Sequence, residues 1–193
     1  MSKQPGIILA SRSPARKNLM KELEVPFECH TSNYEEDMTL FKDPKKLSIH
    51  LASEKARFIA HKFPDSIIIG ADTFGSIGNQ ILGKPSSKEE AYQMIKQMSE
   101  NTVNVHTGLV VIRTDSQGEI KKELASHTLT KLTFIKLSDK NIKDIIEKDD
   151  VLNVAGAITI EGESGKYVDT IEGDYHNVIG LPLFQLKEML AVI

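Results

Sequence analysis

Three observations in the sequence predict a mixed α/β fold. Short apolar runs typical of strands alternate along the chain with segments of helical periodicity. Three isoleucines at 67–69 stand directly before Gly70 and indicate a central strand that is buried on both faces. Apolar and polar residues alternate over 103–112, and a turn at 115–118 leads into a return strand at 119–135, which predicts one long hairpin.

The elements before the central strand follow from simple local signals. Residues 6–10 form a short apolar run that predicts the first strand. Ser13 is a good N-cap and Pro14 suits the first helical position, so a helix is expected to begin there. Residues 25–30 predict a short strand near an edge because they contain a proline. A long amphipathic helix is expected from Asp43-Pro44 onward; its apolar stripe comprises Leu47, Leu51, Ala52, Phe58, Ile59 and Phe63.

The second half of the chain contains further helix and strand signals. Ser87 and Glu90 have the spacing of a capping box before a helix, and Ser138 caps another. Strands are expected at 154–162 and 167–171, with a tight turn at 162–165 between them. A loop containing glycine and proline, 173–182, then leads into a final helix at 183–190. The length of 193 residues suits a single domain, 1–193.

Composition excludes several classes of protein. The net charge of −3 gives no global positive field, so we expect neither nucleic acid nor a membrane as a partner. Cys29 is the only cysteine, which excludes an intrachain disulfide framework and a cysteine-rich zinc site. The apolar run at 7–10 is too short for a signal peptide or a membrane span, so a cytoplasmic protein is expected. His106 and His127 lack partners at metal-ligand spacing and are interpreted as structural.

The loop after the first strand has the features of an anion site. A helix N-terminus directs free backbone N–H groups outward and favours negative charge. Arg12, Arg16 and Lys17 lie in the same loop and first turn, where cations are unfavourable unless an anion binds. The simpler alternative is a solvated basic helix start capped by Ser13. The loop is not a Walker A loop, because its glycine and lysine pattern is absent.

Four charged residues are candidates for catalysis. Asp72 follows the central strand and Gly70-Ala71, so its carboxylate is expected on a rigid element. Lys84 lies in a turn between a glycine and a proline. Alternatively, Asp72 and Lys84 are ordinary turn residues with no catalytic role. Glu36 belongs to an acidic cluster that is either a solvated loop or a source of Mg²⁺ ligands. Lys55 lies in the middle of a helix, where lysines are usually exposed.

Together these stretches resemble the Maf family of nucleoside triphosphate pyrophosphatases. The matching blocks occur in family order over nearly the whole chain: Leu9-Ala10-Ser11-x-Ser13-Pro14-x-Arg16, Glu54-Lys55-Ala56, Gly70-Ala71-Asp72-Thr73, Gly83-Lys84-Pro85, Thr107-Gly108, Ala155-Gly156-Ala157, Gly162, and Gly173-Asp174-Tyr175-x-Asn177-Val178-x-Gly180-Leu181-Pro182-Leu183. The resemblance implies a Maf/Ham1-like fold, similar to inosine triphosphate pyrophosphatase: an elongated mixed sheet with flanking helices and a cleft between two lobes. It also implies a homodimer.

The activity implied by the resemblance is that of a house-cleaning hydrolase of nucleotide metabolism. Such enzymes cleave the α–β phosphoanhydride of a nucleoside triphosphate with a divalent cation, Mg²⁺ or Mn²⁺. By position, Asp72 resembles the proton acceptor that activates water, and Asp72 and Glu36 resemble the carboxylates near the metal. The residues that resemble the phosphate-binding set are Ser11, Ser13, Arg16, Lys17, Lys55 and Lys84.

Three positions resemble those by which the family distinguishes UTP and dTTP from modified guanine nucleotides. Thr73 matches the pyrimidine type, whereas Glu161 stands where that type has glutamine, and Ala15 where it has arginine. Val154 also replaces a lysine that is usual in the family. A glutamate cannot donate hydrogen bonds as glutamine does, so the base that is read can differ. We expect UTP or dTTP, or a modified nucleotide.

Two other functions remain open at the level of sequence. A nucleotidyltransferase also uses a Ser/Gly-Arg loop with a lysine, but needs a second substrate. A nucleotide-binding regulator of cell division and septum formation would keep the cations without needing Asp72.

Overall fold

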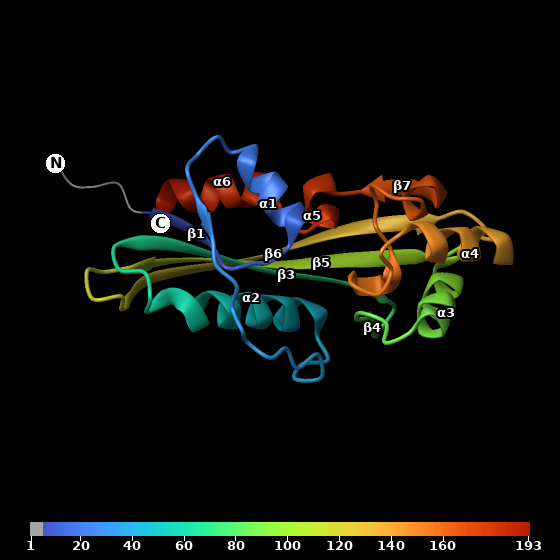
Figure 1. Cartoon of the computed structure of the whole chain (residues 1–193), viewed down its shortest axis with the longest axis horizontal. Helices are drawn as coiled ribbons and strands as arrows, with labels where there is room; N and C mark the ends of the chain where they lie inside the picture. Colours follow the sequence, from blue (N-terminus) through green and yellow to red (C-terminus); the bar gives the residue numbers. More distant parts are fainter. Residues whose placement is uncertain (1–5) are drawn as a thin grey trace. The chain divides into compact units, whose positions relative to one another are not determined.

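The computed structural model of the chain describes residues 6–193, and the fold is mixed α/β as predicted (Figure 1). The strands form one sheet in the order β2-β1-β3-β5-β6-β7, with β4 paired to β3. β1 pairs in parallel with β2 and β3, whereas β3–β4 and β6–β7 are antiparallel, so the sheet is mixed. The strands are β1 (Gly6–Leu9), β2 (Glu28–Cys29), β3 (Ser66–Ile77), β4 (Gln80–Leu82), β5 (Thr102–Thr114), β6 (Ile120–Phe134) and β7 (Val168–Glu172).

The chain divides into two compact units. The first comprises Met1–Asp72, Thr107–Thr128 and Gly180–Ile193, and the second comprises Thr73–His106 and Leu129–Ile179. Strands β3, β5 and β6 contribute residues to both units. That the chain acts as one domain stays a prediction.

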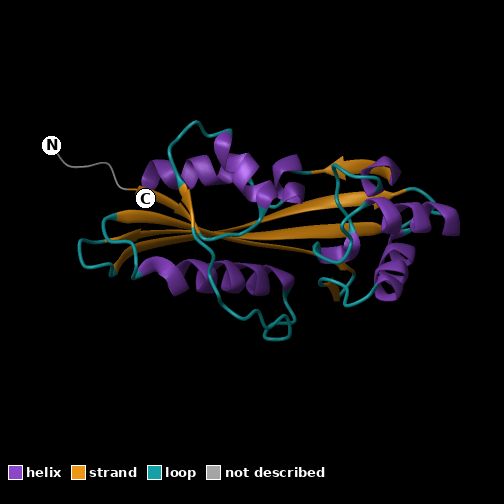
Figure 2. Ribbon diagram, viewed as in Figure 1, coloured by secondary structure: helices purple, strands orange, loops and turns teal. Residues whose placement is uncertain are grey.

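The first unit places helices on both faces of its strands. Helix α2 (Pro44–Ala60) covers one face, and α1 (Pro14–Lys21) and α6 (Leu183–Val192) cover the other (Figures 1 and 2). Asp43 caps α2 by accepting a hydrogen bond of 2.9 Å from the Lys45 amide. The core beneath α2 consists of Ile8, Ala10, Ala52, Ala56, Ile59, Ala60, Ile68, Val110 and Ile112. This confirms the predicted long helix.

Two predictions in this unit need correction. Phe58 was expected in the apolar stripe of α2, but it is 42% exposed, because it lies next to the exposed Arg57 on the outer side of the helix. The predicted strand at 25–30 is reduced to Glu28–Cys29, which pairs with β1 at the edge of the sheet. The edge position itself agrees with the proline at 26.

The second unit contains α3 (Lys88–Met98), α4 (Asp139–Lys148) and α5 (Tyr175–Ile179), packed in part on a cluster around Ile95, Val105 and Leu132. Ser87 caps α3 as predicted, but the Glu90 carboxylate accepts from the Ser86 amide at 2.7 Å and not from Ser87. The Ser87 half of the predicted capping box is therefore present, and only the bond to the Glu90 carboxylate is displaced by one residue. Ser138 caps α4 as predicted.

The strand predicted at 154–162 is wrong. Residues 155–157 form a short 3-10 element, η1 (Ala155–Ala157), and the chain turns there instead of continuing as a strand, because Gly156 and Ala157 adopt left-handed φ angles of 71° and 59°. A second 3-10 helix, η2 (Ser164–Tyr167), follows the turn. The predicted loop at 173–182 contains α5. Within residues 6–193, no helix has both the length and the apolar character needed to span a membrane.

Candidate active site

Asp72 lies inside strand β3, which continues beyond it to Ile77, so the sequence placed the end of this strand too early. Side chains alternate along a strand, so Gly70 and Asp72 face the same side. That side faces α2, because a Cβ at Gly70 would lie 2.2 Å from the Ala52 carbonyl oxygen. The absence of a side chain at Gly70 thus lets α2 approach β3 closely. As a result, the Asp72 carboxylate points toward α2 and is only 5% exposed.

Lys55 is the residue of α2 that meets this carboxylate. It lies three residues after Ala52, on the same face of the helix. Its Nζ contacts Asp72 Oδ1 and lies 2.8 Å from Glu36 Oε1. The expectation that a lysine in mid-helix is exposed is therefore wrong, because Lys55 is 8% exposed. A buried ammonium is stable only where carboxylates pair with it, as these two do.

Glu36 reaches Lys55 from the segment between β2 and α2. Its side chain is 41% exposed, whereas that of Asp72 is 7% exposed. The two carboxylates therefore differ in solvation although they share one ammonium group. Asp72 is fixed on a strand, whereas Glu36 is on an accessible loop that a ligand could approach.

Arg16 lies in the first turn of α1, as predicted, and its side chain is directed by a backbone group. Its Nε donates a hydrogen bond of 2.8 Å to the Gly180 carbonyl. Burial lowers the pKa of Arg16, and the charges of Asp72 and Glu36 oppose this by raising it. The guanidinium thus belongs to the same electrostatic cluster as Lys55.

The role of Gly180 was missed by the sequence reasoning. Gly180 has a φ of 119°, a conformation that L side chains rarely adopt, and this presents its carbonyl to Arg16. The Gly180-Leu181-Pro182 run was the available signal, but a backbone acceptor has no side-chain signature.

The serines of the first loop organise the start of α1. Ser13 Oγ accepts from the Arg16 amide at 3.4 Å, which confirms Ser13 as the N-cap. Ser11 Oγ accepts from the Ser13 amide at 3.1 Å and is buried. Lys17 is exposed and Ala15 is half-buried on the same helix. The structure therefore brings Ser11, Ser13 and Arg16 together at one helix start.

The remaining candidate residues lie in the second unit. Lys84 is exposed in the loop after β4, and Thr73 is half-buried at the point where β3 enters that unit. Glu161 is exposed in the turn between η1 and η2.

The carboxylate pair is the candidate metal site. Among residues 6–193 there is no group of three or more His, Cys, Asp or Glu side chains arranged to hold a metal. Mg²⁺, however, is commonly bound by one or two carboxylates together with water and substrate phosphates. Asp72 and Glu36 both contact Lys55 Nζ, which places them within reach of a single small cation. The donor set therefore fits a divalent cation whose remaining ligands are water or a bound anion.

Sequence comparison connects this arrangement with known proteins. The sequence matches the model of the Maf-like protein family over residues 6–193. The chain belongs to the Maf-like family. A dTTP/UTP pyrophosphatase of Ruminiclostridium cellulolyticum is 39% identical over 186 residues, covering 96% of this chain and 94% of its own. One from Methanosarcina barkeri is 41% identical over 185 residues, covering 95% and 92%.

A solved structure supports the Maf/Ham1-like fold. A HAM1 protein from Coxiella burnetii superposes with a TM-score of 0.55 at 16% identity, covering 98% of this chain and all of its own. At this identity the likeness concerns the fold alone. The predicted family resemblance and the fold are thus both confirmed.

Proposed function

We propose that this Maf-family protein is a nucleoside triphosphate pyrophosphatase that hydrolyses UTP or dTTP to the monophosphate and pyrophosphate. The observation that carries the proposal is the cluster of Arg16 and Lys55 with Asp72 and Glu36 in the first unit. Relatives of about 40% identity that are named dTTP/UTP pyrophosphatases support the same reaction. Two cations and two carboxylates are the groups that a phosphoanhydride hydrolase needs.

The cations would neutralise the substrate. A nucleoside triphosphate carries about four negative charges near neutrality, and water attacks its α-phosphorus only when those charges are offset. Arg16 can bind two phosphate oxygens at once, whereas Lys55 acts as a point charge. We assign Ser11, Ser13 and the amides at the start of α1 to phosphate binding, with Lys17 and Lys84 as further cations.

Asp72 is the proposed general base. A base must be held within hydrogen-bond reach of the water that it deprotonates. Its position on β3 and its burial give Asp72 a fixed orientation. When the substrate binds, its phosphates would compete with the carboxylates for Lys55. Release of Asp72 from this ammonium would leave the carboxylate available to take a proton.

A divalent metal, Mg²⁺ or Mn²⁺, would be held by Asp72 and Glu36. Bound there, it would supply charge neutralisation and a more acidic water. Glu36 is suited to bind the metal before Asp72 does, because its side chain is the more exposed of the two carboxylates.

The preferred base is proposed as uracil or thymine. Thr73 and the names of the relatives favour this assignment. Glu161 instead matches the type that takes modified guanine nucleotides, and Ala15 departs from the arginine of the pyrimidine type. We place the enzyme in the cytoplasm as a single-domain homodimer, with no nucleic acid or membrane partner. Light scattering of the purified protein would test the dimer.

A nucleotide screen tests the proposed function. The purified protein is assayed with Mg²⁺ against standard and modified nucleoside triphosphates, with pyrophosphate and orthophosphate measured separately. Pyrophosphate from UTP or dTTP is the expected product. Pyrophosphate from a modified purine nucleotide alone would reverse the base assignment. Orthophosphate alone would contradict the site of cleavage, and nucleotide binding without turnover would favour a regulator.

A further inference from the structure

The turn that carries Glu161 is closed by hydrogen bonds at both ends. The Gly162 amide donates to the Thr159 carbonyl at 2.9 Å, and the Thr159 amide donates to Ser164 Oγ at 2.8 Å. Ser164, which accepts one of these bonds, is itself buried at 1% exposure. Glu161 lies at the exposed side of the turn. The backbone around Glu161 is therefore held in one conformation, although the residue itself faces solvent.

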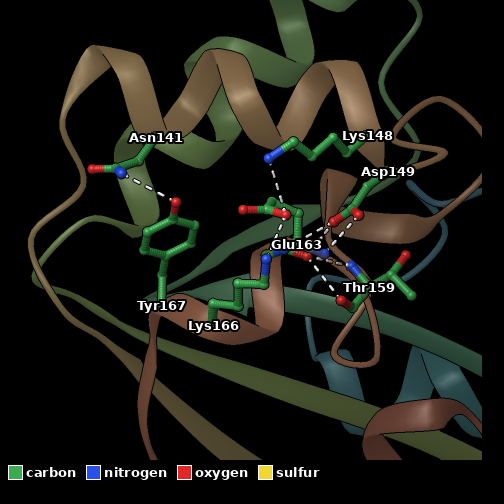
Figure 3. A network of polar contacts seen from close by, with 8 residues as sticks. Asn141, Lys148, Asp149, Thr159, Glu163, Lys166 and Tyr167 are labelled. Atoms are coloured by element: carbon green, nitrogen blue, oxygen red, sulfur yellow. Dashed lines mark hydrogen bonds and ion pairs between the residues drawn. The ribbon is translucent and has the colours of Figure 1, made fainter.

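Asp149 fixes this turn from outside. Its Oδ1 accepts from the Glu163 amide at 2.7 Å, and its Oδ2 accepts from the Ser164 amide at 2.9 Å (Figure 3). Ser164 Oγ also lies 2.8 Å from Oδ2 and 2.9 Å from the Thr159 carbonyl, so its single proton goes to one of these two acceptors. One carboxylate thus binds two consecutive backbone amides.

The Asp149 carboxylate is unfavourable for the helix on which it lies. Asp149 is the C-cap of α4, where the helix dipole repels negative charge. Its charge is compensated by the turn and not by the helix. Gly162 gives independent support, because a Cβ there would lie 2.4 Å from Asp149 Oδ1. A side chain at the position after Glu161 would therefore displace this carboxylate from the turn.

Glu163 adds a second attachment of the turn. Its carboxylate pairs with Lys166 at 2.8 Å and with Lys148 of α4 at 3.3 Å (Figure 3). The hydrogen bond from Lys166, together with that from Lys148, lowers the pKa of Glu163. These pairs are with exposed lysines and contribute little energy. The hydrogen bonds that the Asp149 carboxylate accepts from two backbone amides are therefore the main constraint on the turn.

We propose that Asp149 is a positioning residue for nucleotide selection, holding the Thr159–Ser164 turn so that Glu161 reads the base. The inference rests on the proposed function, which assigns Glu161 to base selection. Asp149 does not touch the substrate in this proposal. It acts through Glu161, so its loss should change selectivity between nucleotides more than turnover.

Asp149→Asn tests the proposal. In either orientation of the new amide, its NH₂ group faces one of the two backbone N–H donors, so one hydrogen bond is replaced by a repulsive contact. We expect the ratio of kcat/KM for UTP to that for CTP to change about tenfold, mainly through KM. The kcat for the preferred nucleotide should stay within about threefold of that of the wild type.

Asp150→Asn is the matched control. It makes the same change of charge one residue away, on an exposed side chain that accepts from the Asn153 side chain at 2.8 and 3.0 Å and not from the turn. Its selectivity ratio should equal that of the wild type. The same variants are made in a Glu161→Ala background, where Asp149→Asn should produce no further change in selectivity.

The outcomes separate this inference from the function on which it rests. A folded Asp149→Asn protein with unchanged selectivity would overturn the positioning role while leaving the pyrophosphatase intact. An equal and additive effect in the Glu161→Ala background would also overturn it. If Asp149→Asn does not fold, Ser164→Ala decides, because it removes the hydroxyl that contacts Asp149 Oδ2 and both the amide and the carbonyl of Thr159 and so loosens the same turn; unchanged selectivity in that variant overturns the proposal that the fixed turn positions Glu161. Absence of pyrophosphate from the wild type with every nucleotide would refute the function itself, and the inference with it.

Discussion

The ammonium group of Lys55 contacts the carboxylate of Asp72, and both side chains are buried between α2 and β3. The contact joins residues from two elements that Gly70 allows to pack closely. Glu36 completes the arrangement from a loop. Lys55 therefore pairs with two carboxylates, and the charge of Arg16 also acts on both of them. A nucleotide with its metal would bring both anionic phosphates and a cation to this group, so binding is expected to redistribute these pairings.

Asp72→Asn should abolish most of the activity and preserve the fold. Loss of a positioned base lowers the rate about 10²–10⁴-fold, and the amide is nearly isosteric with the carboxylate. Pyrophosphate release from UTP measures the effect, and circular dichroism checks folding. Asp65→Asn is the control, because Asp65 is exposed and its φ of 49° is one that asparagine tolerates well. Full activity in folded Asp72→Asn would remove the assignment of this residue.

Lys55→Met should lower the stability of the protein and increase the rise in Tm that Mn²⁺ produces. Removing one partner of a fully buried ion pair costs about 3–5 kcal/mol, and less is expected here because the Glu36 side chain is 41% exposed. The two carboxylates then repel each other, so Mn²⁺ should raise the Tm of the variant more than that of the wild type. Thermal denaturation with and without Mn²⁺ measures both effects. Lys46→Met, on an exposed lysine of the same helix, should behave as the wild type. Equal metal shifts in all three proteins would contradict the metal role of the carboxylates.

Gly70→Ala should destabilise the protein and reduce activity together. The added methyl group would lie 2.2 Å from the Ala52 carbonyl oxygen, so α2 must move away from β3. Overpacking of this kind costs about 1–3 kcal/mol and would shift Lys55 relative to Asp72. Urea denaturation measures the loss. Gly83→Ala is the control for stability, because among residues 6–193, apart from Gly83 and its chain neighbours, no atom lies within 4 Å of a Cβ built there. A Gly70→Ala protein as stable as Gly83→Ala would show that α2 adapts without cost.

Much of the fold is predictable from local patterns, and the exception is instructive. Helices α1, α2, α3 and α4 were indicated by caps and apolar spacing, both of which are local in sequence. The segment at 154–162 contains Ile158, Thr159 and Ile160, which favour a strand. It forms turns instead, because the left-handed residues 156 and 157 and the distant Asp149 determine its path. No local pattern reports such a contact.

The candidate site was predictable in residue type but not in arrangement. Its cations and carboxylates could be named from motif spacing and charge. The burial of Lys55 could not, because helix periodicity alone places most lysines in solvent. It depends on a close contact between Gly70 and Ala52. The hydrogen bond from Arg16 to the Gly180 carbonyl was also hidden, since it involves a backbone atom far away in sequence.

His127 should make stability depend on pH. Burial lowers the pKa of His127 below its ordinary value of 6.5, Lys45 lowers it further, and Asp43 opposes this. The unfolded chain therefore binds a proton more readily than the folded protein, and the free energy of unfolding falls as the pH drops through about 6.5. His127→Gln should lose less stability than the wild type between about pH 8 and about pH 5.5. Lys45→Met should show an intermediate loss, because only the charge contribution is removed. Urea midpoints of the three proteins at both pH values measure these differences, and parallel losses in all three would rule out a contribution from His127.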